Sequence, residues 1–96
     1  MTAVELFEAI RKYEADKDLE GAEEFLLHLA GEKREWLALI HLELGRLYAR
    51  WNLLTSSIHH FHAAVEAALE NQDQILLPQI LAEIAAAREK QKAQRP

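Results

Sequence analysis

Hydrophobic positions recur at the three- and four-residue spacing of amphipathic helices in five stretches of the chain, with short polar breaks between them. The predicted helices cover residues 2–15, 19–30, 33–51 and 53–71, and a fifth begins between residues 74 and 78 and extends to about residue 93. The third stretch has apolar residues on more than one side, which is typical of a helix that packs between neighbours. Because the breaks are short, consecutive helices should pack antiparallel. The pattern thus predicts one all-α domain, residues 1–96, of five antiparallel helices.

Particular residues mark the predicted helix ends. Thr2 followed by Glu5 resembles a capping box at the start of the first helix. Gly31 is expected to end the second helix, because glycine adopts the left-handed conformation at little cost. Asn52 is expected to form the turn after the third helix. Pro78 fits only the first turn of the fifth.

The chain also repeats itself with a displacement of 35 residues. Segment 19–30 resembles segment 54–65, and the same displacement carries Tyr13 onto Tyr48. A repeat of this length, with two helices in each copy, is typical of stacked helix-pair proteins. Such proteins usually bind other proteins or peptides, so the repeat indicates a kind of function without identifying the partner.

The second copy carries a recognisable motif: Leu44-Gly45-Arg46-Leu47-Tyr48, followed by Ser57, Phe61 and Ala64. This motif resembles the tetratricopeptide repeat. The resemblance implies a degenerate repeat at 1–33, a clearer one at 34–71 and a capping helix at 74–93. It implies that Gly45 allows the paired helices to approach closely, while Tyr48 and Phe61 fill the space between them. Ser57 and Ala64 leave room for this packing, and Tyr13 takes the place of Tyr48 in the first copy.

Two positions depart from the family pattern: His41 stands where tryptophan is common, and Ile10 where the first copy should have glycine. A generic helical bundle that acts as a homo-oligomer is therefore the alternative. His59 and His62 share a helix face and are its candidate metal ligands. We expect the three histidines at 59, 60 and 62 to point outward, and we expect no bound metal or other cofactor.

Arginines recur on the first helices of the two copies, at Arg11, Arg46 and Arg50. The resemblance implies that this side of the helices lines a concave groove for an extended peptide. Leu39, Leu42 and Phe7 would form its apolar floor, and the arginines would bind an acidic or carboxylate-bearing partner. The competing interpretation is local ion pairing, of Glu43 with Arg46 or Arg50 and of Glu8 with Arg11 or Lys12.

Composition narrows the function further. The net charge of -5 disfavours a nucleic-acid-binding protein, and the absence of cysteine excludes a disulfide framework or a thiol nucleophile. No signal peptide and no apolar run of membrane-spanning length is apparent, so a cytoplasmic protein without membrane contact is expected. Neither a Gly-x-Ser-x-Gly elbow nor a phosphate-binding glycine loop occurs. We therefore expect a protein-interaction module, such as an adaptor, assembly factor or small regulatory chaperone, that is not an enzyme and forms a homo-oligomer.

Overall fold

The computed structural model describes residues 2–94, and over this range the protein is entirely helical apart from turns. The prediction of an all-α fold with five helices is confirmed. The helices are α1 (Ala3–Ala15), α2 (Leu19–Glu32), α3 (Leu37–Arg50), α4 (Leu54–Glu70) and α5 (Leu76–Ala93), with a single 3-10 turn, η1 (Arg34–Trp36), before α3. None of these helices is both long and apolar enough to cross a lipid bilayer.

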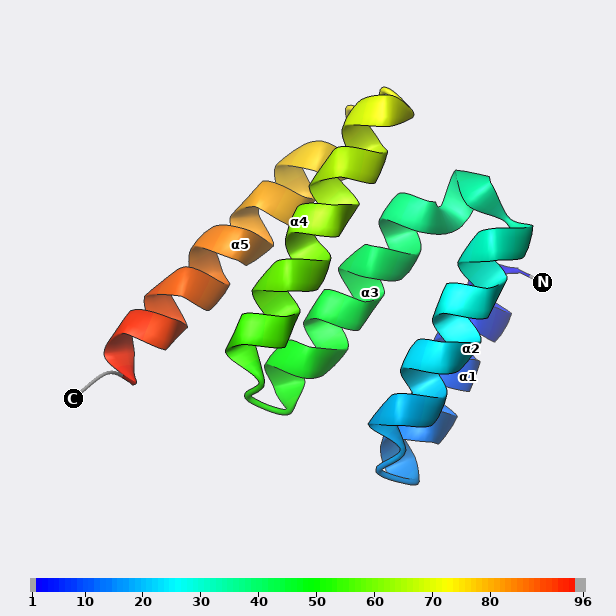
Figure 1. The fold of residues 1–96 in the computed structure, drawn as a ribbon, viewed down its shortest axis with the longest axis horizontal. Coiled ribbons are helices and arrows are strands. Elements are labelled where there is room, and N and C mark those ends of the chain that lie inside the picture. The colour runs from blue at the N-terminus through cyan, green and yellow to red at the C-terminus, as the bar shows by residue number, and fades with distance from the viewer. Residues whose placement is uncertain (1, 95–96) are drawn as a thin grey trace.

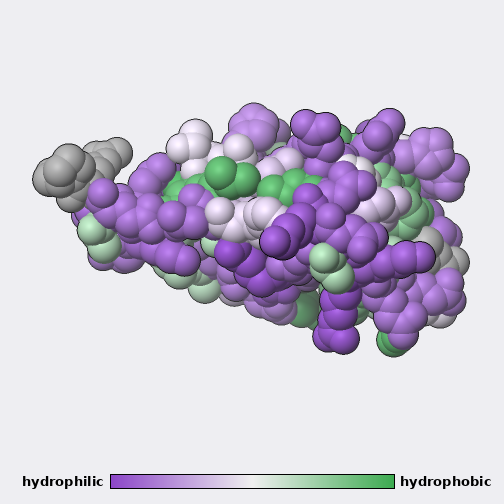
Figure 2. Space-filling model, turned by 90° about the horizontal axis from the view of Figure 1, so that it is seen from below, coloured by the Kyte–Doolittle hydropathy of each residue, from purple (hydrophilic) through white to green (hydrophobic). Residues whose placement is uncertain are grey.

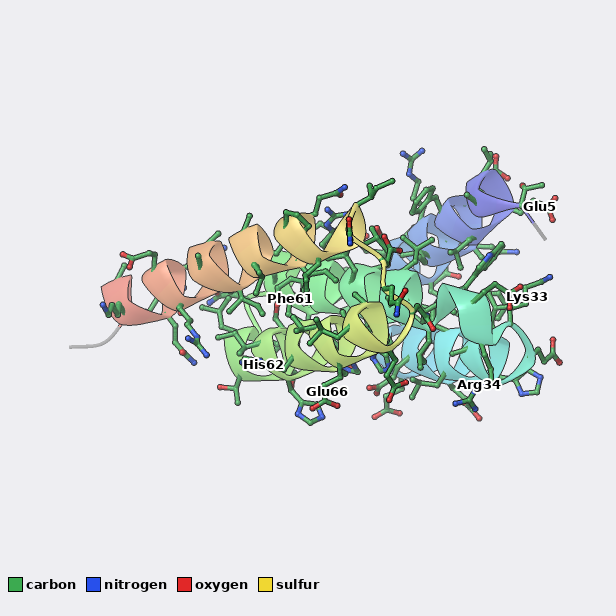
Figure 3. The ribbon with its side chains drawn as sticks, turned by 90° about the horizontal axis from the view of Figure 1, so that it is seen from above. Glu5, Lys33, Arg34, Phe61, His62 and Glu66 are labelled. Atoms are coloured by element: carbon green, nitrogen blue, oxygen red, sulfur yellow. The ribbon has the colours of Figure 1, made fainter. Side chains whose placement is uncertain are left out.

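The helices lie side by side, with the α1–α2 pair at one end of the row and α5 at the other (Figure 1). In the perpendicular view, α2 and α4 run along one side of the molecule, α1 and α5 along the other, and α3 lies between them (Figure 3). The principal extents of 43 × 34 × 18 Å fit a slab about two helices thick. Hydrophilic side chains predominate on the face shown in Figure 2, with a short hydrophobic strip among them.

The turns after α1 and α3 have the same geometry at positions 35 residues apart. Lys17 and Asn52 both adopt the left-handed conformation, with φ of 56° and 60°. The following N–H groups, of Asp18 and Leu53, each donate a 2.9 Å hydrogen bond to the carbonyl oxygen of Tyr13 and Tyr48, respectively. This bond is the signature of a Schellman-type helix end. The turn expected at Asn52 is confirmed, and the equivalent turn at Lys17 follows the displacement seen in the sequence.

Two expected helix boundaries are wrong. Gly31 does not end α2: the helix continues to Glu32, and Lys33 N–H then bonds to Leu29 carbonyl oxygen at 2.8 Å. No glycine in the described part of the chain has a positive φ. The third helix begins at Leu37 rather than at Lys33, because η1 occupies the intervening turn. At the first helix, Thr2 accepts a 3.2 Å hydrogen bond from Glu5 N–H, as the capping interpretation predicts.

The hydrophobic core consists of two clusters that both include α3. The N-terminal cluster packs α1 and α2 against one side of α3, through Leu6, Leu26 and Ile40 among others. The C-terminal cluster packs α4 and α5 against another side of α3, around Phe61 and Ile80. This arrangement explains why the third helix is apolar on more than one side.

Helices α3 and α4 approach closely at Gly45. A side chain at this position would collide with the ring of Phe61, which is buried. Ser57, also fully buried, donates a 2.6 Å hydrogen bond to the carbonyl oxygen of Gly45. Ala64 lies in the same buried cluster as Phe61. The small residues at 45, 57 and 64 therefore make room for the aromatic ring, as expected from the motif.

Candidate functional site

A charged groove runs along the side of α3 that faces α1 and α5. It consists of two adjoining hollows of about 260 and 320 Å³ that share Arg50. The first lies between α1 and α3 and the second between α3 and α5. We call this surface the α3 groove; its lining residues are Phe7, Ile10, Arg11, Glu14, Glu43, Arg46, Ala49, Arg50, Glu83 and Lys90.

A bidentate ion pair joins α1 to α3 across the groove. Arg50 donates from Nε to Glu14 Oε2 and from Nη2 to Glu14 Oε1, both at 2.9 Å. The two parallel bonds fix the guanidinium plane. The hydrogen bond lowers the pKa of the Glu14 carboxyl, and burial opposes it only in part. The same bond raises the pKa of Arg50, so both groups are charged at neutral pH.

Arg46 links α3 to α5 in a similar way. Its Nη1 donates to Glu43 Oε1 at 2.9 Å, and its Nε lies 3.5 Å from Glu83 Oε1. Glu43 is 7% exposed, so this carboxylate is buried beside its partner. The pairing of Glu43 with Arg46 is the local ion pair that the sequence offered as the competing interpretation. Arg50, in contrast, binds Glu14 on another helix.

The structure brings the three predicted arginines to this groove, but it does not place both predicted leucines there. Leu42 is 1% exposed and packs in the cluster around Phe61, so its assignment to the groove floor is wrong. Leu39 is half-buried against the cluster of α1 and α2 and does not line either hollow of the groove. Phe7, the third residue expected in the floor, is 37% exposed and does line the groove.

Sequence reasoning missed the contributions of α5 to the groove, Glu83 and Lys90. Glu83 and Lys90 are seven residues apart, which places them two turns apart on the same side of a helix. This spacing is the feature of the sequence that could have grouped them. Which neighbour that side faces depends on the packing of α5 against α3, and a single sequence does not carry this information.

A second polar cluster ties α2 to α3 and α4. The carboxylate of Glu23 accepts a 3.0 Å hydrogen bond from the Tyr48 hydroxyl and lies 3.0 Å from His60 Nε2. The Tyr48 and His60 rings stack with centroids 5.3 Å apart. Nδ1 of His60 lies 3.2 Å from Nδ1 of His41. His60 is 7% exposed, so the expectation that it points outward is wrong.

The cluster fixes the protonation of its members. His60 N–H faces a carboxylate through Nε2, so its Nδ1 is the acceptor and His41 Nδ1 is the donor. Burial lowers the pKa of His60 despite the opposing effect of Glu23. Burial, and next the neighbouring His60, lowers the pKa of His41. Burial, followed by the bond to Glu23, raises the pKa of Tyr48 to about 12.

This arrangement is an acid–base pair without an adjacent nucleophile. Thr55, Ser56 and His59 border the same hollow of about 390 Å³, but within residues 2–94 no hydrogen bond joins either hydroxyl to a histidine. Thr55 instead accepts a 3.4 Å bond from Gln91. The cluster connects α2, α3 and α4 through Glu23, Tyr48 and His60.

The two candidate metal ligands have different surroundings. His62 Nε2 lies 3.2 Å from Arg88 Nη2 of α5, whereas the His59 ring lies edge-on to His60. In Figure 3, His62 and Glu66 lie along the same helix, α4. Among the described residues, no three side chains of His, Asp or Glu are grouped so as to hold a metal ion.

Comparison of the chain with protein-family models, with curated proteins and with solved structures found no match in any of the three. The likeness to tetratricopeptide repeats therefore stays a prediction from the sequence pattern.

Proposed function

We propose that the protein is a partner-binding module of the tetratricopeptide type, which takes a carboxylate-bearing segment of another protein into the α3 groove. In this proposal, α1–α2 and α3–α4 are the two helix pairs and α5 is the capping helix. The turns at Lys17 and Asn52 lie 35 residues apart and connect the helices within each pair, which supports the repeat; Gln72 forms the same turn between α4 and α5. The packing of Gly45 against Phe61 supports the motif. We propose a cytoplasmic setting with it, since the chain has no cysteine.

One observation carries the proposal: four basic side chains from three helices line a single groove. These are Arg11 of α1, Arg46 and Arg50 of α3, and Lys90 of α5. Within residues 2–94, Arg11 and Lys90 form no ion pair. Three glutamates, Glu14, Glu43 and Glu83, line the groove as well, so the four basic side chains leave an excess of one positive charge. In a chain of net charge -5, this local excess favours a partner of opposite charge.

The internal glutamates prepare the arginines for binding. Arg50 uses Nε and Nη2 on Glu14, which leaves its remaining N–H donors for a second carboxylate. Because the guanidinium is already held in place, a ligand loses less side-chain entropy on contact with it. Phe7 and Ala49 add apolar surface beside these donors, so a short acidic segment with a hydrophobic residue fits the groove.

The test is affinity capture from native cell extract with the wild-type protein and with the double variant Arg46→Glu, Arg50→Glu. We expect the variant to lose the captured partner and to keep its helical content by circular dichroism. Lys12→Glu with Arg34→Glu is the matched control, because both residues are exposed and lie outside the groove. It changes the net charge equally and should leave capture intact.

Capture should also weaken as salt concentration rises, because exposed charge pairs are screened over about 8–10 Å at physiological ionic strength. A folded double variant that still captures every partner would place the binding surface elsewhere and refute the groove proposal.

A further inference from the structure

The outer side of α5 is an apolar stripe with basic residues beyond it. Leu81, Ile84, Ala85, Arg88 and Lys92 lie at intervals of three and four residues and border a shallow surface of about 580 Å³ together with Glu89. Ile84 is buried in the core cluster shared with α4, and Arg88 Nη2 lies 3.2 Å from His62 Nε2 of α4, so Leu81 and Ala85 are the exposed apolar part of the stripe. Leu81 is 51% exposed, and Ala85 beside it is exposed as well. A helix with apolar residues on its outer side as well as its inner side is typical of one that packs between two neighbours.

The opposite end of the molecule has a hollow of complementary character. It is about 410 Å³ in volume and lies on the α1–α2 pair. Tyr13 and Phe25 provide aromatic surface, with ring centroids 5.7 Å apart. Asp18 and Glu24 border it, and His28 on the same rim pairs with the exposed Glu32 at 3.1 Å.

The two surfaces are opposite in charge. Helix α2 carries acidic residues and no lysine or arginine. The stretch of α5 from Arg88 to Lys92 has three basic residues and one acidic residue. Arg88 and Lys92 thus face a partner of opposite sign if the α1–α2 edge of another molecule is placed against α5.

From this complementarity we infer that the protein associates head to tail: the α5 stripe of one molecule packs on the α1–α2 hollow of a second copy. The two surfaces lie at opposite ends of the row of helices (Figure 1), so each molecule keeps one free end after the first contact. Such a heterologous contact does not close on itself and produces linear assemblies that grow with concentration. This inference does not depend on the α3 groove, whose residues take no part in either surface.

Sedimentation velocity over a concentration series tests the inference with two charge-reversal variants. The tail variant is Arg88→Glu with Lys92→Glu, and the head variant is Glu24→Lys with Glu32→Lys. The wild-type protein should show a sedimentation coefficient that rises with concentration and falls back with added salt. Each variant alone should sediment as a monomer, because the altered end of one molecule then has the same charge as the native end of the next and repels it. An equimolar mixture should associate again, since the native tail of one variant meets the native head of the other.

Glu66→Lys with Glu70→Lys, a pair of exposed residues on α4, is the control for the head variant and should associate like the wild type. Circular dichroism and a thermal melt establish that every variant is folded. A wild-type protein that stays monomeric throughout the series would overturn the inference. Association by either variant alone would also overturn it, because that result indicates a symmetric head-to-head or tail-to-tail dimer. A mixture that stays monomeric would overturn it as well.

Discussion

The hydroxyl of Ser57 donates a 2.6 Å hydrogen bond to the carbonyl oxygen of Gly45, in the middle of the contact between α3 and α4. Gly45 has no side chain to hold the helices apart, and the ring of Phe61 occupies the place where one would be. The hydrogen bond and the ring contact both depend on the short distance between the two helices. Substitutions at either residue should therefore destabilise the protein.

Gly45→Ala should lower the free energy of unfolding by about 1–3 kcal/mol, because the added Cβ overlaps the ring of Phe61, which is 1% exposed. Gly31→Ala is the matched control. Gly31 is also inside a helix, but nothing lies within 4 Å of a Cβ placed there. Alanine should stabilise the protein at that position by about 0.5–1 kcal/mol through its better helix propensity. Urea denaturation of the two variants should thus give changes of opposite sign, and equal signs would contradict the close approach at Gly45.

Ser57→Ala should lower the free energy of unfolding by about 0.5–1.5 kcal/mol, because it removes a buried hydrogen bond. Ser56→Ala removes the same hydroxyl from an exposed position on the same helix and should have little effect. Thermal melts of the two variants measure the difference. Equal melting temperatures would show that the bond contributes nothing to stability.

The histidine cluster should make stability fall as the pH is lowered from neutrality. His41 and His60 both have pKa values below the usual 6.5 in the folded protein, mainly because of burial. The unfolded chain therefore binds protons more readily below about pH 6.5, and the free energy of unfolding decreases there. If one proton binds to Nδ1 of His60, His41 can still accept a hydrogen bond from it through its own Nδ1. If both imidazoles are protonated, the two Nδ1–H groups face each other as donors, and the hydrogen bond is lost.

His41→Gln should make this pH dependence shallower, since the amide replaces the N–H donor without titrating. Ser56→Ala replaces an exposed side chain that does not titrate and should leave the dependence unchanged. Urea denaturation at pH 7, 6 and 5 measures both. Parallel curves for the wild type and His41→Gln would exclude His41 as a source of the effect. Glu14 affects stability over a different pH range. Its pKa is lowered below 4.5, so the stability contributed by its ion pair with Arg50 is lost only in stronger acid.

Glu14→Gln should lower the affinity of the α3 groove for the captured partner, because it removes the bidentate carboxylate that holds the Arg50 guanidinium in place. Ordering one such side chain on binding costs about 0.5–1.5 kcal/mol, which corresponds to a decrease of about 2- to 13-fold. Glu8→Gln, at an exposed position of α1, changes the net charge equally and serves as control. Fluorescence anisotropy with a labelled segment of the partner measures both affinities. Equal affinities for the two variants would indicate that Arg50 is not a contact residue.

The sequence was most informative where a single helix determines the outcome: hydrophobic spacing indicated all five helices. The close contact between α3 and α4 at Gly45 was expected from the resemblance of the motif to the tetratricopeptide repeat. The turn at Asn52 followed from the tolerance of asparagine for the left-handed conformation.

The wrong predictions concern residues whose burial depends on the packing of several helices. His60 seemed to belong to the outer side of α4, but α4 packs against more than one neighbour and its buried side is wide enough to include it. Leu42 was placed in the groove, yet the contact of α3 with α4 and α5 buries it. At Gly31, the packing of Leu29 and Ala30 outweighs a cost of about 1 kcal/mol for glycine in a helix.

We expect the two clusters of the core to open as two separate cooperative units. Ala38 and Leu42 of α3 belong to the C-terminal cluster, and Ile40 and Leu44 belong to the N-terminal cluster. The α1–α2 pair is thus able to detach from α3 while the packing around Phe61 stays intact, and its amides should exchange with solvent before those of α4. Detachment also carries Arg11 and Glu14 away from Arg50. A ligand that contacts both α1 and α5 would therefore stabilise the closed state, in which α1 and α2 are packed on α3. Its binding should slow hydrogen exchange and proteolysis in α1 and α2.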